Sequence, residues 1–502
     1  MNWNEFILGL SWVIVIVYTT ALFLLFLYSL TQIVLAWNFY HSQKHPPKRD
    51  HWDFKAGDPY PFVTIQLPVY NELYVMERLL TAITALEYPK DRLEIQLLDD
   101  STDESVALNA RLVEDYQKQG VNIYHHHRKN RTGFKAGALK EGLAKAKGNY
   151  VAIFDADFLP PSDWLLKTVP YFKGERIGVV QTRWSHLNKN YSLLTKMQAF
   201  ALDAHFTLEQ GGRNSQGHFI NFNGTAGLWR KECILDAGNW QGDTITEDMD
   251  LSFRAQLKEW EFLYLDEVET PAELPITMNA IRTQQFRWNK GGAENFQKMI
   301  RKVWKHPQLS LATKCHASVH LLSSTMFLGV LTVAILSVPV LYIKAYWPGF
   351  KNYFEFISLF FISTLFFLVG YWQMYQKRYR NGWMGFINYI KRFTLFYALA
   401  MGLSVHNSLA ILEGHWGIKS DFVRTPKFNV ISSKDSWKNN KYIAQHISIN
   451  VLWESLLALY FLFGIYSAFT VGKEGDLGLL PFHCMLFFGF SYIIVQSIRA
   501  RA

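Results

Sequence analysis

The chain has 502 residues, 49% of them hydrophobic and 16% aromatic, with a formal net charge of +9. This length exceeds one typical domain, and so much apolar surface is unusual for a wholly soluble enzyme. Cys233, Cys315 and Cys484 show no paired spacing, which argues against a disulfide framework or a cysteine zinc site. The positive charge fits cytoplasmic loops of a membrane protein, so we expect no nucleic-acid partner.

The N-terminal segment, residues 1–45, is predicted to be a transmembrane helix. Residues 6–40 carry no charge, and a span needs about 20 apolar residues. A cleavable signal peptide is disfavoured, because the apolar run is too long and no basic segment precedes it. Glu5 lies before the run and Lys44 and Arg49 lie after it, so the positive-inside rule places the N-terminus outside and the following residues in the cytoplasm.

Apolar segments return in residues 301–502, where we expect four more spans. If residues 393–412 also crossed, the basic loop 420–441 and Arg499 would lie outside, against the charge rule. We therefore expect residues 393–412 to form an interfacial helix. Glu454 is the clearest charged residue inside a span, and it either lines a glycan channel or marks a non-catalytic transporter. The four spans are predicted at residues 320–343, 354–375, 443–470 and 479–498.

The middle of the chain, residues 55–300, is predicted to be a cytoplasmic α/β domain. Short apolar runs alternate with helical stretches, which is typical of a doubly wound, mostly parallel sheet. Ligands bind at the carboxyl ends of the strands in such sheets. Strands are expected at residues 63–67, 93–98, 121–125 and 150–154, with helices at 73–86, 106–119 and 133–147.

Two acidic pairs follow predicted strands. Asp155 and Asp157 are i and i+2 on an extended chain, so their carboxylates point the same way and suit Mg²⁺ or Mn²⁺ with a diphosphate. A solvated turn is the alternative. In the pair Asp99-Asp100, one carboxylate is expected to cap the next helix, which leaves the other free for a base or ribose.

Basic residues lie between these two acidic pairs. Lys135 sits among small residues where a nucleotide could approach, and Arg128, Lys129 and Arg131 precede it. A plain basic surface is the alternative. Residues 125–127 are three histidines, but neighbours in a strand alternate faces, so at most two converge and we reject a metal site there.

A third acidic group, Thr246-Glu247-Asp248, begins an apparently helical segment with Thr246 as its expected N-cap. Carboxylates stabilise helix N-termini, so a structural role is the alternative to a catalytic one. Asp248 could take a proton from a sugar hydroxyl. Residues 222–227 form a small loop in which the backbone at Gly224 could approach a ligand closely.

Gln284, Arg287 and Trp288 share one side of a predicted helix by their i, i+3, i+4 spacing. Arg suits bidentate contact with a departing diphosphate, and Trp offers a flat face to a sugar ring. A helix-packing stripe would explain Trp288 but not all three residues together.

The combined pattern resembles the membrane-spanning family 2 glycosyltransferases, the processive β-glycan synthases. Its sequence motifs are most similar to those of plant cellulose-synthase-like mannan and glucan synthases. The resemblance runs from about residue 63 to residue 427. The motifs that carry it are Leu67-Pro68-Val69-Tyr70-Asn71-Glu72, Leu98-Asp99-Asp100-Ser101-Thr102-Asp103, Asp203-Ala204-His205-Phe206-Thr207-Leu208-Glu209-Gln210, Glu247-Asp248-Met249-Asp250-Leu251 and Gln284-Gln285-Phe286-Arg287-Trp288.

The resemblance implies a GT-A fold and an inverting displacement at the anomeric carbon of a nucleotide sugar. Asp157 with Asp155 would hold Mg²⁺ or Mn²⁺, Asp248 beside Glu247 would be the general base, and Gln284 with Arg287 and Trp288 would frame the acceptor site. A loop at about residues 413–430 is similar to the loop that covers the nucleotide in cellulose synthases. Its sequence motif differs in that Arg424 is inserted before the threonine. Substrate-binding residues would be Tyr70, Glu72, Asp99, Asp100, Lys135, Asp155, Gly224, Thr225, Gln284, Trp288, Thr425 and Lys427.

The expected activity is the processive transfer of a hexose from UDP-glucose or GDP-mannose into a β-linked glycan that crosses the membrane. The expected partners are the nucleotide sugar, the glycan acceptor and the lipid bilayer of a cell or Golgi-type membrane. The alternative is a lipid glycosyltransferase that adds one sugar to ceramide, a glycerolipid or a polyprenyl phosphate. The sequence leaves open the donor sugar, the linkage, accessory secretion proteins and a homo-oligomer.

Overall fold

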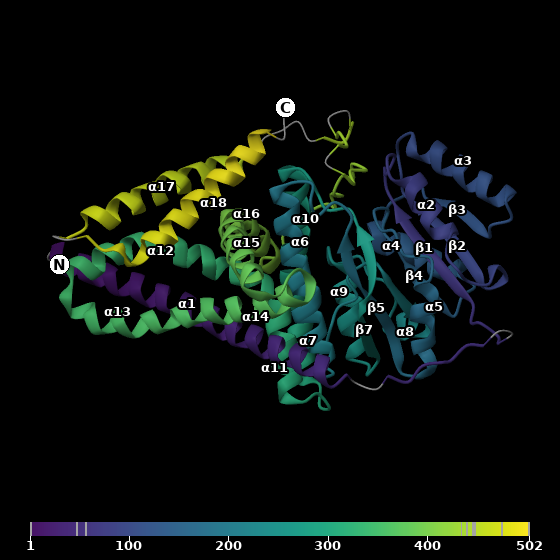
Figure 1. Cartoon of the computed structure of the whole chain (residues 1–502), viewed down its shortest axis with the longest axis horizontal. Helices are drawn as coiled ribbons and strands as arrows, with labels where there is room; N and C mark the ends of the chain where they lie inside the picture. Colours follow the sequence, from purple (N-terminus) through teal and green to yellow (C-terminus); the bar gives the residue numbers. More distant parts are fainter. Residues whose placement is uncertain are drawn as a thin grey trace.

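The computed structural model describes residues 3–46, 49–55, 58–432, 434–437, 440–443, 448–472 and 475–499. Residues 438 and 439 of the lysine-rich loop, and residues 444–447 of the fourth predicted span, lie outside these ranges. Figure 1 shows long helices at one end of the molecule, a twisted sheet at the other, and α6, α10, α15 and α16 between them. The N-terminus of α1 lies at the end of the helical bundle far from the sheet.

The sheet has seven strands in the order β3-β2-β1-β4-β6-β5-β7. Strands β1 to β4 are mutually parallel and β5 is parallel to β7, whereas β6 runs antiparallel to both of its neighbours. The sheet is therefore mostly parallel, as the alternating sequence pattern predicts. The strands are β1 (Val63–Val69), β2 (Leu93–Asp99), β3 (Ile123–His127), β4 (Tyr150–Ile153), β5 (Ile177–His186), β6 (Gly227–Arg230) and β7 (Glu261–Ala272).

Two hydrophobic cores cover the two faces of the sheet. Successive residues of a strand point to opposite faces, so Ala152 packs in one core while Val151 and Ile153 pack in the other. Helices bury both faces, which explains why these strands read as continuous apolar runs. The helices of this domain are α2 (Met76–Thr84), α3 (Ser105–Lys118), α4 (Phe134–Lys145), α5 (Trp164–Thr168), α6 (Leu193–Ala204), α7 (Gly211–Asn214), α8 (Lys231–Asp236), α9 (Glu247–Gln256) and α10 (Met278–Lys305).

Five helical segments in the described part of the chain are long and apolar enough to cross a membrane, or six if the bent pair Gly382–Gly402 and Ser404–His415 forms one span. α1 packs on α12 and α14, and α17 packs on α18. The helices of this region are α1 (Trp3–Lys44), α11 (Leu311–Leu322), α12 (Met326–Tyr346), α13 (Lys351–Ile357), α14 (Ile362–Arg378), α15 (Gly382–Gly402), α16 (Ser404–His415), α17 (Asn450–Thr470) and α18 (Leu480–Arg499).

The ambiguous segment forms α15 and α16, which meet at a bend of 52°. α16 packs along α10 and buries the polar residues His406 and Asn407. Glu454 in α17 does not stand free in a channel, because both of its carboxylate oxygens accept hydrogen bonds from Arg282 of α10, each at 2.7 Å. This buried pair joins the sheet domain to the last two spans.

The topology with an interfacial α15–α16 segment predicts that Ser432 faces the cytoplasm. A Ser432→Cys protein, with the exposed Cys315 and Cys484 replaced, should react with an impermeant thiol reagent in sealed, right-side-out vesicles only after permeabilisation. Gly349→Cys, in a loop predicted to face out, should react without permeabilisation and serves as the control. Labelling of Ser432→Cys in intact vesicles would contradict this topology.

Candidate active site

A cavity of about 110 Å³ opens at the carboxyl ends of β1, β2 and β4, beneath the loop that contains Phe422 and Lys427. Its position agrees with the rule that ligands bind at strand ends in parallel sheets. Many residues predicted from the sequence line this cavity. They are Tyr70, Glu72, Asp100, Lys135, Asp155, Asp157, Arg287, Thr425 and Lys427.

Asp155 and Asp157 follow β4 and each faces a lysine. The Nζ of Lys135 lies 2.5 Å from Oδ1 of Asp155, and the Nζ of Lys427 lies 2.6 Å from Oδ2 of Asp157. Among the described residues, no three His, Cys, Asp or Glu side chains gather as a complete metal cage. The two carboxylates instead fit an ion of the Mg²⁺ type, which takes one or two protein carboxylates and completes its shell with water and phosphate oxygens.

The other acidic pair, Asp99 and Asp100, divides between the interior and the cavity. Asp99 is fully buried behind the cavity wall, where its carboxylate accepts hydrogen bonds from the Ser101 amide and Asn109 and contacts Nε2 of His125, each at 2.8 Å. Asp100 lines the cavity. The expected helix cap is wrong, because α3 begins after Glu104 and Asp103 accepts the hydrogen bond from the Ser105 amide.

Two of the three histidines contact the turn that follows β2, His125 at Asp99 and His127 at Ser101. His125 and His127 lie on one side of β3, and their rings are 6.2 Å apart. Nε2 of His127 contacts the carbonyl oxygen of Ser101 at 3.0 Å. His126 packs instead on Tyr124. The alternation of faces predicted from the sequence is confirmed.

The base candidates Glu247 and Asp248 form the first turn of α9. Desolvation raises the pKa of both carboxyl groups, and the charge of Lys135 opposes the rise. A Cβ added to Gly224 would lie 3.0 Å from Oδ2 of Asp248, and the Gly224 carbonyl accepts a hydrogen bond from Lys135 at 2.9 Å. Glycine has no Cβ, which permits this close approach and also the left-handed φ of 80° at Gly224.

Two threonines, Thr246 and Thr225, form hydrogen bonds that fix the segments around the base candidates. Thr246 does not cap α9 with its side chain; its hydroxyl accepts a hydrogen bond from Asn295 of α10 at 2.9 Å. Thr225 is buried, and its hydroxyl accepts the hydrogen bond of the Asp155 amide at 2.9 Å. The Gly224–Thr225 turn therefore holds both Lys135 and Asp155 in place.

Arg287 of α10 reaches the loop that roofs the cavity. Its Nη2 donates to the hydroxyl of Thr425 at 2.9 Å, and its guanidinium lies 4.6 Å from the centroid of the Phe422 ring. Gln284 and Trp288, the other members of the predicted group, are half-buried on the same helix and lie outside the lining of this cavity.

The inserted Arg424 forms a direct contact with the cavity floor. Its Nη1 lies 3.2 Å from Oε2 of Glu72, and its guanidinium stacks 4.0 Å from the Tyr442 ring centroid. Burial raises the pKa of Glu72 to about 7, while Arg424 and Lys427 oppose the rise. The inserted Arg424, which departs from the family's sequence motif, therefore adds an ion pair between the loop over the cavity and Glu72.

A family model described as glycosyltransferase like family 2 matches residues 60–291, which span this sheet and cavity. Residues 60–291 form a family 2 glycosyltransferase domain. The mostly parallel sheet of this domain and its strand-end site fit a GT-A fold, and the apolar helices lie beside it (Figure 1).

Curated plant proteins resemble the glycosyltransferase domain closely. A probable glucomannan 4-beta-mannosyltransferase 4 from Oryza sativa subsp. japonica is 45% identical over 262 residues, which are 51% of this chain and 48% of that protein. Glucomannan 4-beta-mannosyltransferase 9 from Arabidopsis thaliana is 44% identical over 279 residues, 54% of this chain and 52% of that protein. The chain spans about half the length of the curated relatives it matches.

Among solved structures, the mannosyltransferase PcManGT from Pyrobaculum calidifontis, in complex with GDP-Man and Mn²⁺, is similar with a TM-score of 0.52. The similarity covers 80% of this chain and all of that chain at 15% sequence identity. At this identity the likeness supports the fold alone.

The sequence analysis named Arg128 and Arg131 as neighbours of Lys135 without giving them a role, and the structure brings both to the site. Arg128 donates to both oxygens of Asp100, each at 2.7 Å, and Arg131 lies 3.4 Å from the centroid of the Tyr70 ring in the cavity. Because β2 and β3 are parallel neighbours, the residue after His127 must lie beside the end of β2. The predicted pairing of these two strands could therefore have placed Arg128 next to Asp100.

The raised pKa values of the Glu247–Asp248 pair predict a pH dependence. A base must be deprotonated, so the rate of sugar transfer should fall as the pH drops through an acidic limb that lies above the ordinary Asp pKa of about 4. Initial rates measured at saturating donor across the acidic range would show the limb. A rate that stays constant down to about pH 5 would contradict a desolvated carboxylate base.

Proposed function

We propose that the chain is a processive, inverting glycosyltransferase that polymerises a hexose from a nucleotide sugar into a β-1,4-linked glycan. One observation carries the proposal: the strand-end carboxylates, Lys135 and Arg287 line one cavity, and the desolvated pair Glu247–Asp248 lies next to Lys135. The names of the plant relatives point to mannose as the transferred sugar, so we take GDP-mannose as the donor.

Donor binding would use the groups that line the cavity. Tyr70, Asp100 and Arg131 lie at one end, where an aromatic ring and polar groups can hold the base and ribose. Asp155 and Asp157 would hold a divalent ion of the Mg²⁺ or Mn²⁺ type, which when bound neutralises charge on the diphosphate. Lys135, Arg287 and Lys427 are the nearby cations for the same diphosphate; GDP-Man and Mn²⁺ are also what the structural neighbour PcManGT binds.

The transfer step follows from the placement of Asp248. Asp248 takes the proton from the acceptor hydroxyl, whose oxygen forms a bond to the anomeric carbon. The bond between that carbon and the diphosphate oxygen breaks on the opposite face, and Arg287 stabilises the departing nucleoside diphosphate. Attack from the opposite face inverts the anomeric configuration, and Gln284 and Trp288 would position the acceptor sugar.

The loop at residues 413–430 must move for a donor to enter. Small-molecule sites typically measure about 300–1,000 Å³, whereas the roofed cavity measures about 110 Å³. Contacts between Lys427 and Asp157, Arg287 and Thr425, and Arg424 and Glu72 hold the roof down. We infer that the loop lifts, admits the donor and closes over it.

We further propose that the protein is an integral membrane enzyme with residues 1–45 as its first span, residues 55–300 in the cytoplasm and residues 301–502 as the second membrane region. Five apolar helices support membrane insertion. The helix α10 carries Arg287 and Trp288 and contacts α16 and α18, so a growing chain would leave the site next to the membrane helices.

Purified protein in lipid, supplied separately with GDP-mannose and with UDP-glucose in the presence of Mn²⁺, tests this function. Released nucleotide diphosphate and the size of the sugar product should both be measured. We expect GDP release with a polymer that an endo-β-1,4-mannanase degrades. A product of one sugar on a lipid would instead support a ceramide-type or polyprenyl-phosphate transferase and overturn the polymerase assignment.

A further inference from the structure

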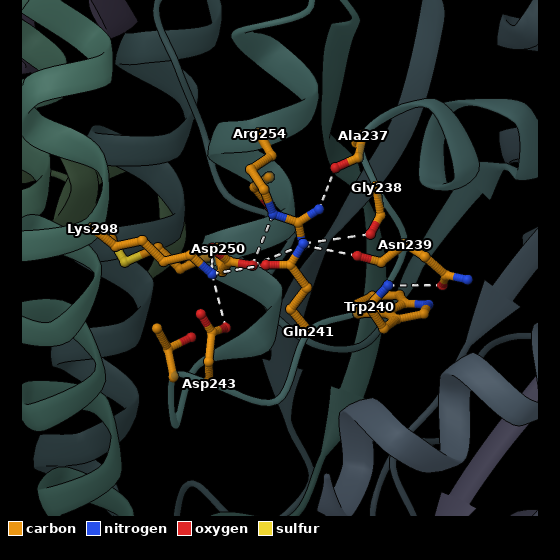
Figure 2. Close-up of polar contacts among 12 residues, drawn as sticks. Ala237, Gly238, Asn239, Trp240, Gln241, Asp243, Asp250, Arg254 and Lys298 are labelled. Carbon is orange, nitrogen blue, oxygen red and sulfur yellow. Dashed lines mark hydrogen bonds and ion pairs between the residues drawn. The ribbon is translucent and has the colours of Figure 1, made fainter. Parts of the chain in front are cut away.

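Behind the proposed base lies a buried cluster of charges with no assigned role. Asp250 is fully buried, and its Oδ2 accepts hydrogen bonds from Nε and Nη2 of Arg254 at 2.9 and 2.7 Å. Its Oδ1 lies 2.7 Å from Nζ of Lys298 on α10. Figure 2 shows the three side chains meeting between α9 and α10. We call Asp250, Arg254 and Lys298 the Asp250 clamp.

The clamp also holds the loop that leads into α9. Arg254 donates to the carbonyl oxygens of Ala237 and, at 2.9 Å, Asn239, while Lys298 contacts Oε1 of Gln241 at 3.0 Å (Figure 2). The backbone at Asn239 has a left-handed φ of 61°, a conformation that asparagine adopts more readily than most non-glycine residues. Lys298 also pairs with Asp243 at 2.8 Å.

Asp250 and Asp248 face opposite sides of α9. Residues two positions apart on an α-helix are separated by about 200° around its axis. Asp248 therefore lies toward Gly224, on the side opposite Asp250, which faces the loop and α10. The contacts of Thr246 with Asn295 and of the Ile245 amide with Glu294 join the same two elements, at 2.9 and 2.8 Å. The position of Asp248 therefore depends on how α9 is fixed to α10.

The same helix α10 carries Arg287, the residue proposed to stabilise the departing diphosphate. Arg287 lies eleven residues before Lys298, which is about 16 Å along a straight helix. One end of α10 thus faces the diphosphate and the other end anchors the helix that bears the base. A rigid connection of this kind sets the distance between base and leaving group, and a shift of about 1 Å can cost 10²-fold in rate.

We propose that Asp250, Arg254 and Lys298 are positioning residues that fix the general base Asp248 relative to Arg287 without contacting the substrate. This inference rests on the proposed function. A charge cluster that serves folding alone would change thermal stability and activity together, because a lone buried charge destabilises the whole domain. A positioning cluster should change the catalytic rate even where stability is preserved.

Full-length protein in lipid should be measured as wild type, Lys298→Met, Lys298→Arg and the triple variant Asp250→Asn/Arg254→Met/Lys298→Met. We expect Lys298→Met to lower kcat about 10- to 10²-fold while the donor KM stays within about twofold. Lys298→Arg, which keeps the charge, should restore most of the rate. The triple variant removes all three charges of the clamp, so its thermal stability should exceed that of Lys298→Met while its kcat stays low.

Lys377→Met is the matched control, because Lys377 also pairs with a buried aspartate, Asp266, at 2.7 Å but lies away from the cavity. Its kcat should equal that of the wild type. A wild-type kcat in folded Lys298→Met, or recovery of kcat together with stability in the triple variant, would overturn the positioning role. Retained transfer by Asp248→Asn in the same assay would instead show that the base assignment itself fails.

Discussion

Asp248→Asn is expected to lower kcat for sugar transfer by about 10²–10⁴-fold, the usual effect of losing one general base. Asparagine has the same shape as aspartate but cannot accept the proton of the attacking hydroxyl. The donor KM should change little, because the donor would be held by Asp100, Asp157, Arg287 and Lys427 on other elements. Steady-state kinetics on reconstituted protein would separate the two parameters.

Asp115→Asn, on the exposed face of α3, supplies the control, since this side chain forms only a loose ion pair with Lys118 at 4.0 Å. Its kinetics should match the wild type. A folded Asp248→Asn protein with undiminished transfer would refute the base assignment. Loss of the acidic limb in its residual rate would support that assignment further.

Asp157→Asn is expected to lower kcat/KM by at least about 10²-fold. Mutation of a residue that only hydrogen-bonds to a metal ligand typically lowers metal affinity or activity 10- to 100-fold, and loss of a ligand itself should cost more. The asparagine oxygen carries no charge, so the ion that neutralises the diphosphate would bind more weakly. A direct measurement is Mn²⁺-dependent binding of GDP by calorimetry, which requires no turnover. In wild-type protein, EDTA should abolish both this binding and the transfer reaction.

Lys427→Met provides the contrast for Asp157→Asn. The lysine lies 2.6 Å from the Asp157 carboxylate and competes with a metal for it, so its removal should leave Mn²⁺ binding intact or stronger. Transfer should still fall, because a cation is lost from the diphosphate site. Unchanged Mn²⁺-dependent GDP binding by folded Asp157→Asn would contradict the metal role.

The sequence predicted the site best where it depends on strand ends. Asp100, Asp155 and Asp157 follow apolar runs that stop at the edge of the sheet, and parallel neighbours bring such ends together. The five long apolar helices were also expected from the length of their apolar runs. Both predictions rest on local patterns that tertiary packing does not reverse.

Contacts between distant segments were not predictable in this way. The pairing of Glu72 with Arg424 joins residues 352 positions apart, and neither side chain signals the other in the sequence. Glu454 was expected to line a channel because its own apolar segment contains no charged partner. Its partner Arg282 lies on α10, far away in the sequence. Thr246 fitted a helix cap, but Asn295 of a packed helix offered its hydroxyl a better-placed donor.

Product length at low donor conversion tests the central claim most directly. Purified protein in lipid, with GDP-mannose and Mn²⁺, should be stopped when only a small share of the donor has reacted, and the products sized. A processive synthase yields long β-1,4-linked chains from the first turnovers, with most acceptor unextended. Products that grow evenly by one or a few sugars, or a single glycolipid, would contradict the account.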